Sequence, residues 1–156
     1  LERGLRDLEP TPGAVEPGAR HVVPVLYDGP DLASAASTLG LGADEVIDFH
    51  SGRDYAVFAV GFLPGFPYAG YLPAELSGLA RRGEPRIQVA AGSVAIAGRQ
   101  TGIYPSESPG GWHLLGRTPL QIADPDAGRF PIRAGDAIRF QPIGPAEYEA
   151  RRHDRL

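Results

Sequence analysis

Glycine and proline are the residues that most constrain what this chain can fold into. The sequence holds 21 glycines and 16 prolines among 156 residues, a share roughly twice the usual one. Hydrophobic residues still make up 42% of the chain, and a chain of this length can bury a sizeable core. Because glycine and proline interrupt helices and favour turns, we predict a turn-rich fold of many short strands.

The residue types that are missing exclude several classes of function. The chain has no cysteine, and all fifteen basic residues are arginine. Without cysteine there is no disulfide framework, no thiolate nucleophile and no zinc site built on sulfur, which suits a soluble protein of the reducing cytoplasm. Without lysine there is no P-loop and no Schiff-base or general-base lysine. The formal net charge of -4 gives no basic footprint for nucleic acid, and no apolar run is long enough to span a membrane.

The first third of the chain contains the predicted helices. Leu1, Leu5 and Leu8 recur at helical spacing, and the prolines that follow end this short helix. Residues 21–27 resemble a strand, which Pro24 places at a sheet edge. Asp31 is a good N-cap for a helix that ends at Gly40, and a second helix is expected over residues 43–51.

From residue 54 onward, short apolar stretches alternate with glycine and proline. This spacing favours an antiparallel barrel or sandwich over alternating strands and helices. The charged end of the chain, residues 146–156, is expected to form a frayed helix. The predicted strands cover residues 55–60, 87–89, 93–97, 112–115, 120–123 and 137–140.

The histidines do not predict a metal site. His21, His50, His113 and His153 lack the i, i+2 or i+4 spacing of a local ligand pair. His50 lies near the end of the second predicted helix, where a cation is favoured, so a capping role is preferred over catalysis.

Three segments between residues 61 and 118 concentrate aromatic and polar side chains. Residues 61–73 combine four aromatic residues with three prolines and three glycines, so these aromatics either line a rigid groove or plug the end of a barrel. Residues 89–105 place Arg99, Gln100 and Thr101 after an apolar strand, although a tight strand corner would use the same glycines. Ser93 lacks the G-x-S-x-G context of a nucleophile.

The third segment, residues 106–118, carries a glycine pair after a Ser-Pro turn. Successive N–H groups at Gly110 and Gly111 can form an anion-binding nest, with charge supplied by Arg117 or Arg99. A hairpin turn without a ligand fits the same residues. His113 is either a general base or an ordinary exposed strand residue.

Four stretches in this order resemble the family of allophanate hydrolase subunit 1, which includes the B subunit of 5-oxoprolinase and the sporulation kinase inhibitor. They are residues 61–72 (GFLPGFPYAGYL), 91–105 (AGSVAIAGRQTGIYP), 108–119 (SPGGWHLLGRTP) and 135–143 (GDAIRFQPI). The resemblance implies a mainly β fold, a cyclophilin-like antiparallel β-barrel with a few short helices. It also implies that residues 19–156 are the barrel domain and that residues 1–18 are a linker plus the last helix of a missing ferredoxin-like domain.

The family resemblance further implies a function that needs partners. The leading expectation is a non-autonomous, cytoplasmic subunit of an ATP-dependent 5-oxoprolinase, which opens 5-oxoproline to glutamate with a homologous second subunit and a third one. ATP belongs to the complete complex, and no metal or prosthetic group is expected in this chain. Alternatives within the family are a groove-bearing module that inhibits a sensor histidine kinase, and a part of a urea carboxylase or allophanate hydrolase system.

The expected groove for substrate or partner takes its residues from the three segments. We expect arginine and backbone N–H groups to hold an anionic oxygen while aromatic rings exclude water. No nucleophile–base pair is visible, so no catalytic residue is assigned. The expected groove residues are Phe66, Tyr68, Ser93, Arg99, Gln100, Thr101, Tyr104, Ser108, Trp112, His113 and Arg117.

Overall fold

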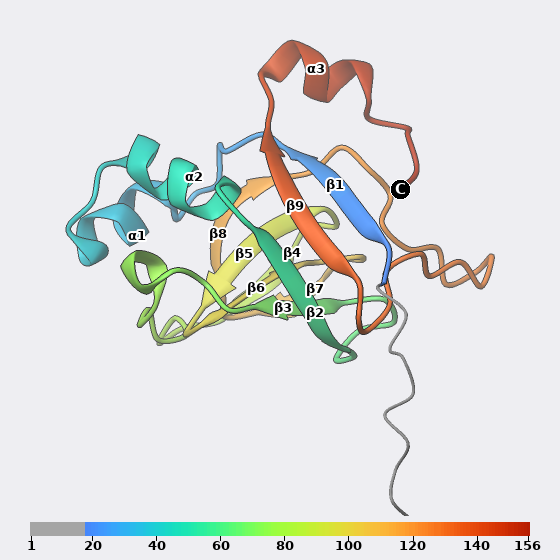
Figure 1. The fold of residues 1–156 in the computed structure, drawn as a ribbon, viewed down its shortest axis with the longest axis horizontal. Helices are drawn as coiled ribbons and strands as arrows, with labels where there is room; N and C mark the ends of the chain where they lie inside the picture. The colour runs from blue at the N-terminus through green and yellow to red at the C-terminus, as the bar shows by residue number, and fades with distance from the viewer. Residues whose placement is uncertain (1–17) are drawn as a thin grey trace, which may run out of the picture.

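The structure, a computed structural model, describes residues 18–156 and consists mainly of short strands (Figure 1). The expected helix at Leu1 to Leu8, and with it nearly all of the expected N-terminal segment, lies outside the described residues. The elements are β1 (Arg20–Val25), α1 (Leu32–Leu39), α2 (Ala43–Ser51), β2 (Asp54–Val60), β3 (Pro67–Gly70), the 3-10 helix η1 (Ala74–Leu76), β4 (Arg86–Val89), β5 (Ser93–Ala97), β6 (Gln100–Ile103), β7 (Ser108–Gly110), β8 (His113–Arg117), β9 (Ala137–Pro142) and α3 (Pro145–Ala150).

Seven strands form a nearly closed barrel. Their order is β1-β9-β2-β3-β6-β5-β8, and an antiparallel bridge between Leu26 and Arg117 joins the two ends of the sheet. All neighbouring pairs in this sheet are antiparallel except β1 and β9, which run parallel. The predicted barrel is therefore confirmed, and Pro24 lies in β1, the first strand of the order, where a missing N–H is tolerated.

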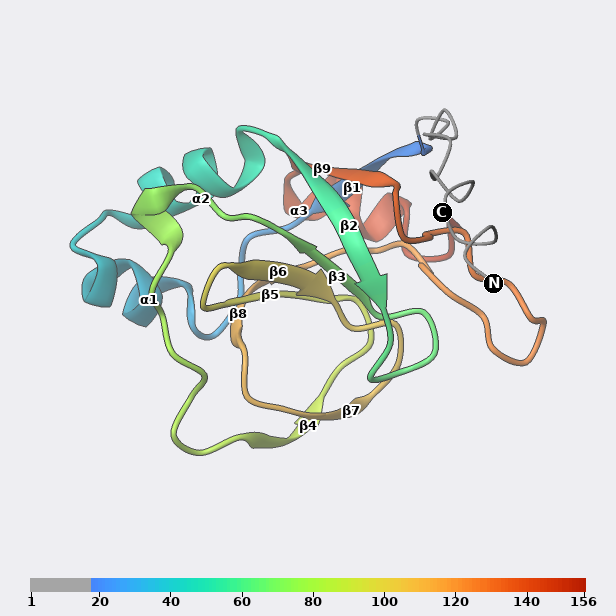
Figure 2. The same cartoon turned by 60° about the horizontal axis from the view of Figure 1, so that its bottom comes forward.

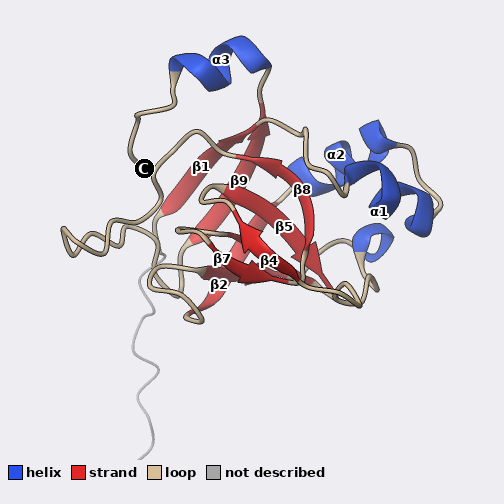
Figure 3. Ribbon diagram, turned by 180° about the vertical axis from the view of Figure 1, so that it is seen from behind, coloured by secondary structure: helices blue, strands red, loops and turns tan. Residues whose placement is uncertain are grey.

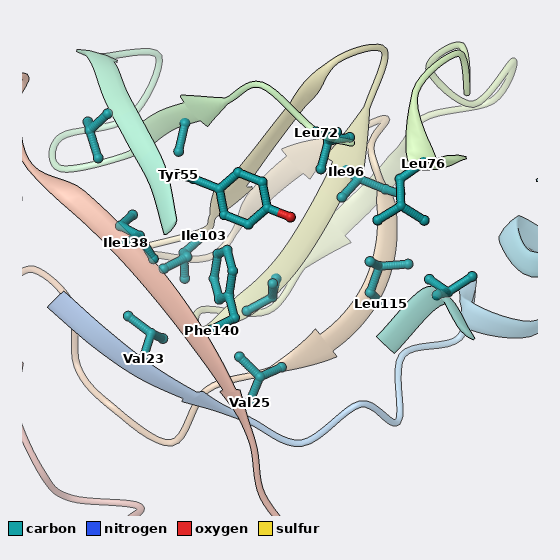
Figure 4. Close-up of a cluster of buried hydrophobic side chains, with 14 of the residues drawn as sticks. Val23, Val25, Tyr55, Leu72, Leu76, Ile96, Ile103, Leu115, Ile138 and Phe140 are labelled. Atoms are coloured by element: carbon teal, nitrogen blue, oxygen red, sulfur yellow. The ribbon is translucent and has the colours of Figure 1, made fainter. Parts of the chain in front are cut away.

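The barrel interior is filled by side chains from almost every strand (Figure 4). Tyr55 and Phe140 lie near its centre, and both are at most 1% exposed. Val23 and Val25 enter from β1, and Leu115 enters from β8. Along β2 and β9 buried residues alternate with exposed or partly exposed ones, and the buried set of each strand, Tyr55 and Val57 in β2 and Ile138 and Phe140 in β9, faces this core.

A second layer covers part of the outside of the barrel. Strands β4 and β7 pair only with each other, and Figure 2 shows them below β5 and β6. Strand β5 is consequently buried along its whole length: Val94 and Ile96 belong to the barrel core, while Ala95 and Ala97 pack in a separate cluster with Trp112. A strand covered on both faces explains a continuous apolar run without alternation.

The helices lie at the margins of the barrel. α1 and α2 pack together beside one end, and α3 lies apart from them above β1 and β9 (Figures 1 and 3). α1 begins after Asp31 and ends at Gly40, whose φ of 71° is the left-handed conformation expected of a C-cap glycine. The predicted bounds of the second helix, residues 43–51, agree with α2. No helix within residues 18–156 is long and apolar enough to cross a membrane.

Two local predictions are wrong. Residues 120–123 are not a strand: Leu120, Ile122 and Ala123 are buried, but only Gln121 forms an isolated bridge, to Arg155. The apolar character of this segment therefore reflects burial without a neighbouring strand to pair with. The expected helix over residues 146–156 is confined to α3, which ends at Ala150.

Candidate functional site

An aromatic hollow of about 220 Å³ opens between the barrel and the β4–β7 layer. Its rings come from the loop before β3, from β3 itself and from the segments around β6 and β8, so residues far apart in the sequence meet here. The aromatic hollow is lined by Phe62, Phe66, Tyr68, Arg81, Pro85, Tyr104, Pro109, Gly110, Gly111 and Trp112.

Phe66 is the ring around which the others pack. It meets Tyr104 and Trp112 edge to face, with ring centroids 5.2 Å and 5.6 Å away, and it meets Tyr68 at 4.9 Å. Tyr68 also packs edge to face on Trp112 at 5.9 Å. Such arrangements are favourable for aromatic pairs, so the wall is rigid and preformed.

Tyr104 contributes the buried hydroxyl of this wall. The side chain is 1% exposed, and burial raises the pKa of its phenol, against the opposing effects of a hydrogen bond from the Trp112 backbone N–H and nearby arginine charge. Tyr104 therefore remains a neutral hydrogen-bond donor at physiological pH. A Cβ at Gly110 would collide with the Tyr104 ring and hydroxyl, so only glycine fits at that position.

A second, cationic hollow of about 370 Å³ adjoins the first. Trp112 and Arg81 line both hollows. The Arg99 guanidinium lies 4.2 Å from the centre of the Tyr71 ring, a cation–π contact that orients its plane. The cationic hollow is lined by Tyr71, Ala80, Arg81, Ala97, Gly98, Arg99, Gln100 and Trp112.

The segment between η1 and β4, residues 77–85, forms one wall of both hollows, and we call it the strap. Figure 2 shows it sweeping out below the sheet before it reaches β4. It supplies Arg81 and Pro85 to the aromatic hollow. Its backbone is attached by hydrogen bonds from the His113 ring to the Ala80 carbonyl, 2.7 Å, and from the Arg82 N–H to the Gly111 carbonyl, 2.7 Å.

Asp31 anchors the strap and the start of β4 to the barrel. Its carboxylate, 5% exposed, accepts one hydrogen bond from Arg82, two from Arg86 and one from the Leu114 N–H, all between 2.6 and 2.8 Å. Burial alone would raise the pKa of this carboxyl, but the Arg86 and Leu114 hydrogen bonds and the two arginine charges hold the pKa below its ordinary value. Asp31 does precede α1, yet its side chain makes no capping hydrogen bond, because it is committed to these partners.

The structure brings six of the eleven expected groove residues to the two adjoining hollows. Phe66, Tyr68, Tyr104 and Trp112 line the aromatic hollow, and Arg99 and Gln100 line the cationic one. Of the two interpretations of residues 61–73, a preformed wall describes Phe66 and Tyr68 better than a barrel plug.

The other five expected residues lie elsewhere or have structural partners. Ser93 and Arg117 line a separate hollow, where Arg117 is paired with Asp28. Ser93, Thr101 and Ser108 donate their hydroxyl protons to backbone carbonyls. His113 bonds to the strap, as described above.

Two chemical expectations are also revised. Neither Gly110 nor Gly111 has a positive φ, so the pair lacks the alternating backbone of an anion nest and serves instead as a close-packed wall. His50 is not a cationic helix cap: it is fully buried, and burial lowers its pKa to about 3. Within residues 18–156, no three His, Asp or Glu side chains gather to hold a metal ion.

The lining residues that the expected groove did not include are, among others, Phe62, Tyr71, Arg81 and Pro85. Phe62 and Tyr71 belong to the aromatic segment of residues 61–73, and Phe62 has a φ of 65°, an unusual value for a bulky residue. No local signal marks Arg81 or Pro85, because the strap reaches the site only through contacts with distant residues.

The fold and the site together define a mainly β barrel protein with an aromatic hollow on its outer side. A family model described as "Carboxyltransferase domain, subdomain C and D" matches residues 1–131, and the chain belongs to this family. Distant crystal structures share the fold: the urea amidolyase of Kluyveromyces lactis aligns with a TM-score of 0.65 at 19% identity, over 85% of this chain and 10% of that one.

Closer relatives are similar over most of the chain. It is 50% identical over 135 residues to the B subunit of 5-oxoprolinase from Escherichia coli O157:H7, which covers 83% of this chain and 61% of that protein. It is 42% identical over 132 residues to the B subunit of 5-oxoprolinase from Bacillus subtilis strain 168, over 82% and 55% of the two chains. The crystal structure of PH0987 from Pyrococcus horikoshii aligns with a TM-score of 0.77 at 42% identity, over 83% and 61%. The chain thus spans between 55% and 61% of the length of the two curated relatives.

Proposed function

We propose that this chain is a subunit of an ATP-dependent 5-oxoprolinase, which opens the lactam ring of 5-oxoproline to give glutamate. The observation that carries the proposal is the 50% identity to the B subunit of 5-oxoprolinase over 135 residues, a span that includes most of the barrel. In this reaction water adds to the lactam carbonyl and the C–N bond breaks, which leaves a free amine and a new carboxylate. ATP hydrolysis by the complete complex drives the opening.

The chemistry of the hollows favours a subunit that binds and positions over one that catalyses alone. Neither hollow is lined by a histidine, serine, threonine, aspartate or glutamate of the described residues. Apart from tyrosine, a general base or a nucleophile that attacks a carbonyl normally comes from these residue types or from lysine and cysteine. The chain has neither lysine nor cysteine, and burial raises the pKa of the Tyr104 phenol, which keeps it neutral. We therefore place the catalytic groups on partner subunits: the homologous second subunit and, in our proposal, a third one. The cytoplasmic location stays a prediction.

The aromatic hollow contributes exclusion of water and orientation. Its rings form a preformed apolar wall, and its buried Tyr104 offers one hydroxyl donor. A donor fixed in a dry site can bind the oxygen of an amide carbonyl and stabilise the charge that develops there when water attacks.

Reconstitution tests the proposal. The full chain is combined with the candidate second and third subunits from the same organism, ATP and 5-oxoproline, and glutamate is measured. We expect glutamate only in the complete mixture, with none when this chain or ATP is left out. No glutamate from the complete mixture would contradict the proposal.

A parallel measurement addresses the family's other activity. Autophosphorylation of a sensor histidine kinase from the same organism is followed with and without the chain. A 5-oxoprolinase subunit leaves the rate unchanged, whereas a kinase inhibitor lowers it in proportion to occupancy.

A further inference from the structure

The two adjoining hollows differ in chemistry although they share Trp112 and Arg81. One is walled by rings, and the other by two arginines and an amide. We infer that together they form one binding site for a small ring-bearing carboxylate, with the carboxylate at Arg81 and Arg99 and the ring against Phe66 and Trp112. This inference rests on the proposed function, because it assigns the substrate's carboxylate to named residues of the site.

Charge is the first argument. Arg81 and Arg99 form no ion pair with any residue of the described range, 18–156, and no acidic side chain in that range lines either hollow. The neighbouring Arg82 and Arg86 are both paired with Asp31. Two guanidinium groups without an acidic partner at one hollow attract an anion.

Geometry favours a carboxylate over a phosphate. The Tyr71 ring holds the plane of the Arg99 guanidinium, and a planar guanidinium matches either a carboxylate or a phosphate through two parallel hydrogen bonds. Phosphate sites usually add a group of free backbone N–H donors. Here the Gly98 N–H already donates to the Leu79 carbonyl and the Gly78 N–H to the Gly98 carbonyl.

Size limits the ring. Ligand pockets usually measure roughly 300–1,000 Å³, and the aromatic hollow, at about 220 Å³, lies below that range. A five-membered lactam ring fits this space. Tyr104 lines this hollow, and its hydroxyl can donate to the lactam carbonyl.

Trp112 provides the measurement, because it is the single tryptophan of the chain and lines both hollows. Its fluorescence in the full chain is titrated with 5-oxoproline, with 2-pyrrolidinone, which has the same ring without the carboxylate, and with inorganic phosphate. We expect a saturable change with 5-oxoproline, and at least about tenfold weaker binding of 2-pyrrolidinone and of phosphate.

Charge-removing variants locate the carboxylate. Arg99→Gln and Arg81→Gln should each raise the Kd for 5-oxoproline about tenfold and leave the weak binding of 2-pyrrolidinone unchanged. Arg133→Gln is the matched control, because Arg133 is also exposed and lines a different hollow. The Kd of this variant for 5-oxoproline should equal that of the unmodified chain.

Three results would overturn the inference: no saturable response to 5-oxoproline, equal binding of 2-pyrrolidinone or phosphate, or an unchanged Kd in both Arg99→Gln and Arg81→Gln. Each is independent of the reconstitution assay. If the complex makes glutamate but the titration fails, the substrate binds elsewhere and the proposed function stands. If the titration succeeds but no glutamate forms, the carboxylate site stands and the proposed reaction does not.

Discussion

His50 illustrates how one residue gains its role from its surroundings. The Thr101 hydroxyl donates to the Ala95 carbonyl at 3.0 Å and so accepts from His50 Nε2, 2.8 Å away. Nδ1 is then the acceptor for the Tyr27 hydroxyl at 2.7 Å. The ring also stacks on Phe140, with centroids 4.4 Å apart. A neutral histidine satisfies every one of these contacts, and this chain of bonds ties α2 to β6.

This environment predicts how stability depends on pH. Burial lowers the pKa of folded His50 from 6.5 to about 3, so the unfolded chain binds the extra proton between these values. The contribution of neutral, buried His50 to the free energy of unfolding is complete above pH 6.5 and is lost as the pH falls toward 3. We expect the free energy of unfolding to decrease by up to about 1.4 kcal/mol per pH unit below 6.5, as measured by urea denaturation.

A matched pair of variants isolates His50. The slope between pH 6.5 and 5 should largely disappear in His50→Asn and persist in His153→Asn, because His153 is exposed. Asp31 does not interfere, since its folded pKa is lowered and its contribution fades only below its unfolded value of 3.8. An unchanged slope in His50→Asn would mean that other groups set the acid sensitivity.

At the level of elements, the strap is held to the barrel by Leu79, which is buried in the core, and by a few polar contacts. It has no strand partner within the described residues apart from the isolated bridge between Leu79 and Gly98. Asp31 gathers Arg82 and Arg86 from the strap and from the start of β4, and it also binds the Leu114 N–H of β8. One carboxylate thereby sets the distance between two walls of the aromatic hollow.

Removal of this carboxylate should loosen the strap. We expect Asp31→Ala to lower the free energy of unfolding by about 2–4 kcal/mol, because a buried N–H and two arginines lose their acceptor. Trypsin should then cleave the native chain after Arg81 or Arg82 faster than in the unmodified protein. Asp28→Ala is the control: it breaks an exposed pair with Arg117 and should cost no more than about 1 kcal/mol. Equal protease resistance in the two variants would refute the anchoring role of Asp31.

At the level of the whole molecule, exposed aromatic side chains surround the two hollows. Phe58, Phe62 and Tyr71 are 48%, 64% and 59% exposed. The Phe58 ring lies 6.2 Å from Tyr71 and 6.4 Å from Tyr68, so the exposed surface is continuous with the wall of the aromatic hollow. In the proposed complex, we expect a partner subunit to cover this surface and close the site from outside.

This expectation gives a test of assembly. Phe58→Ser should weaken binding to the partner subunit at least about tenfold without changing thermal stability by more than a few degrees, because the ring is half exposed. Val22→Ser is the control, since Val22 is 42% exposed and lines neither hollow. Calorimetric titration with the partner subunit measures the affinity of each variant. The same affinity for Phe58→Ser as for the control would place the interface elsewhere.

Much of the architecture was predictable because it depends on local chemistry. Gly40 ends α1 in the left-handed conformation that glycine favours. The spacing of apolar runs predicted the barrel strands β1, β2, β5, β8 and β9, although not β3 and β6. The rings of Phe66, Tyr68, Tyr104 and Trp112 were identified because aromatic residues with glycine and proline are conspicuous in the sequence.

Other features depended on which distant segments meet. Ser93 and Arg117 lie in segments rich in site residues, yet they line a different hollow, because the ends of β5 and β8 that carry them face the Asp28 loop. Arg81 and Pro85 carry no local signal and reach the site because Asp31, some fifty residues earlier, binds the strap. The sequence by itself determined a turn-rich barrel with an aromatic wall, since propensity and periodicity are local. Only the tertiary structure decided which arginines lie at that wall without an acidic partner. Ion pairing depends on which distant segments are brought together, and the order of residues along the chain does not reveal this.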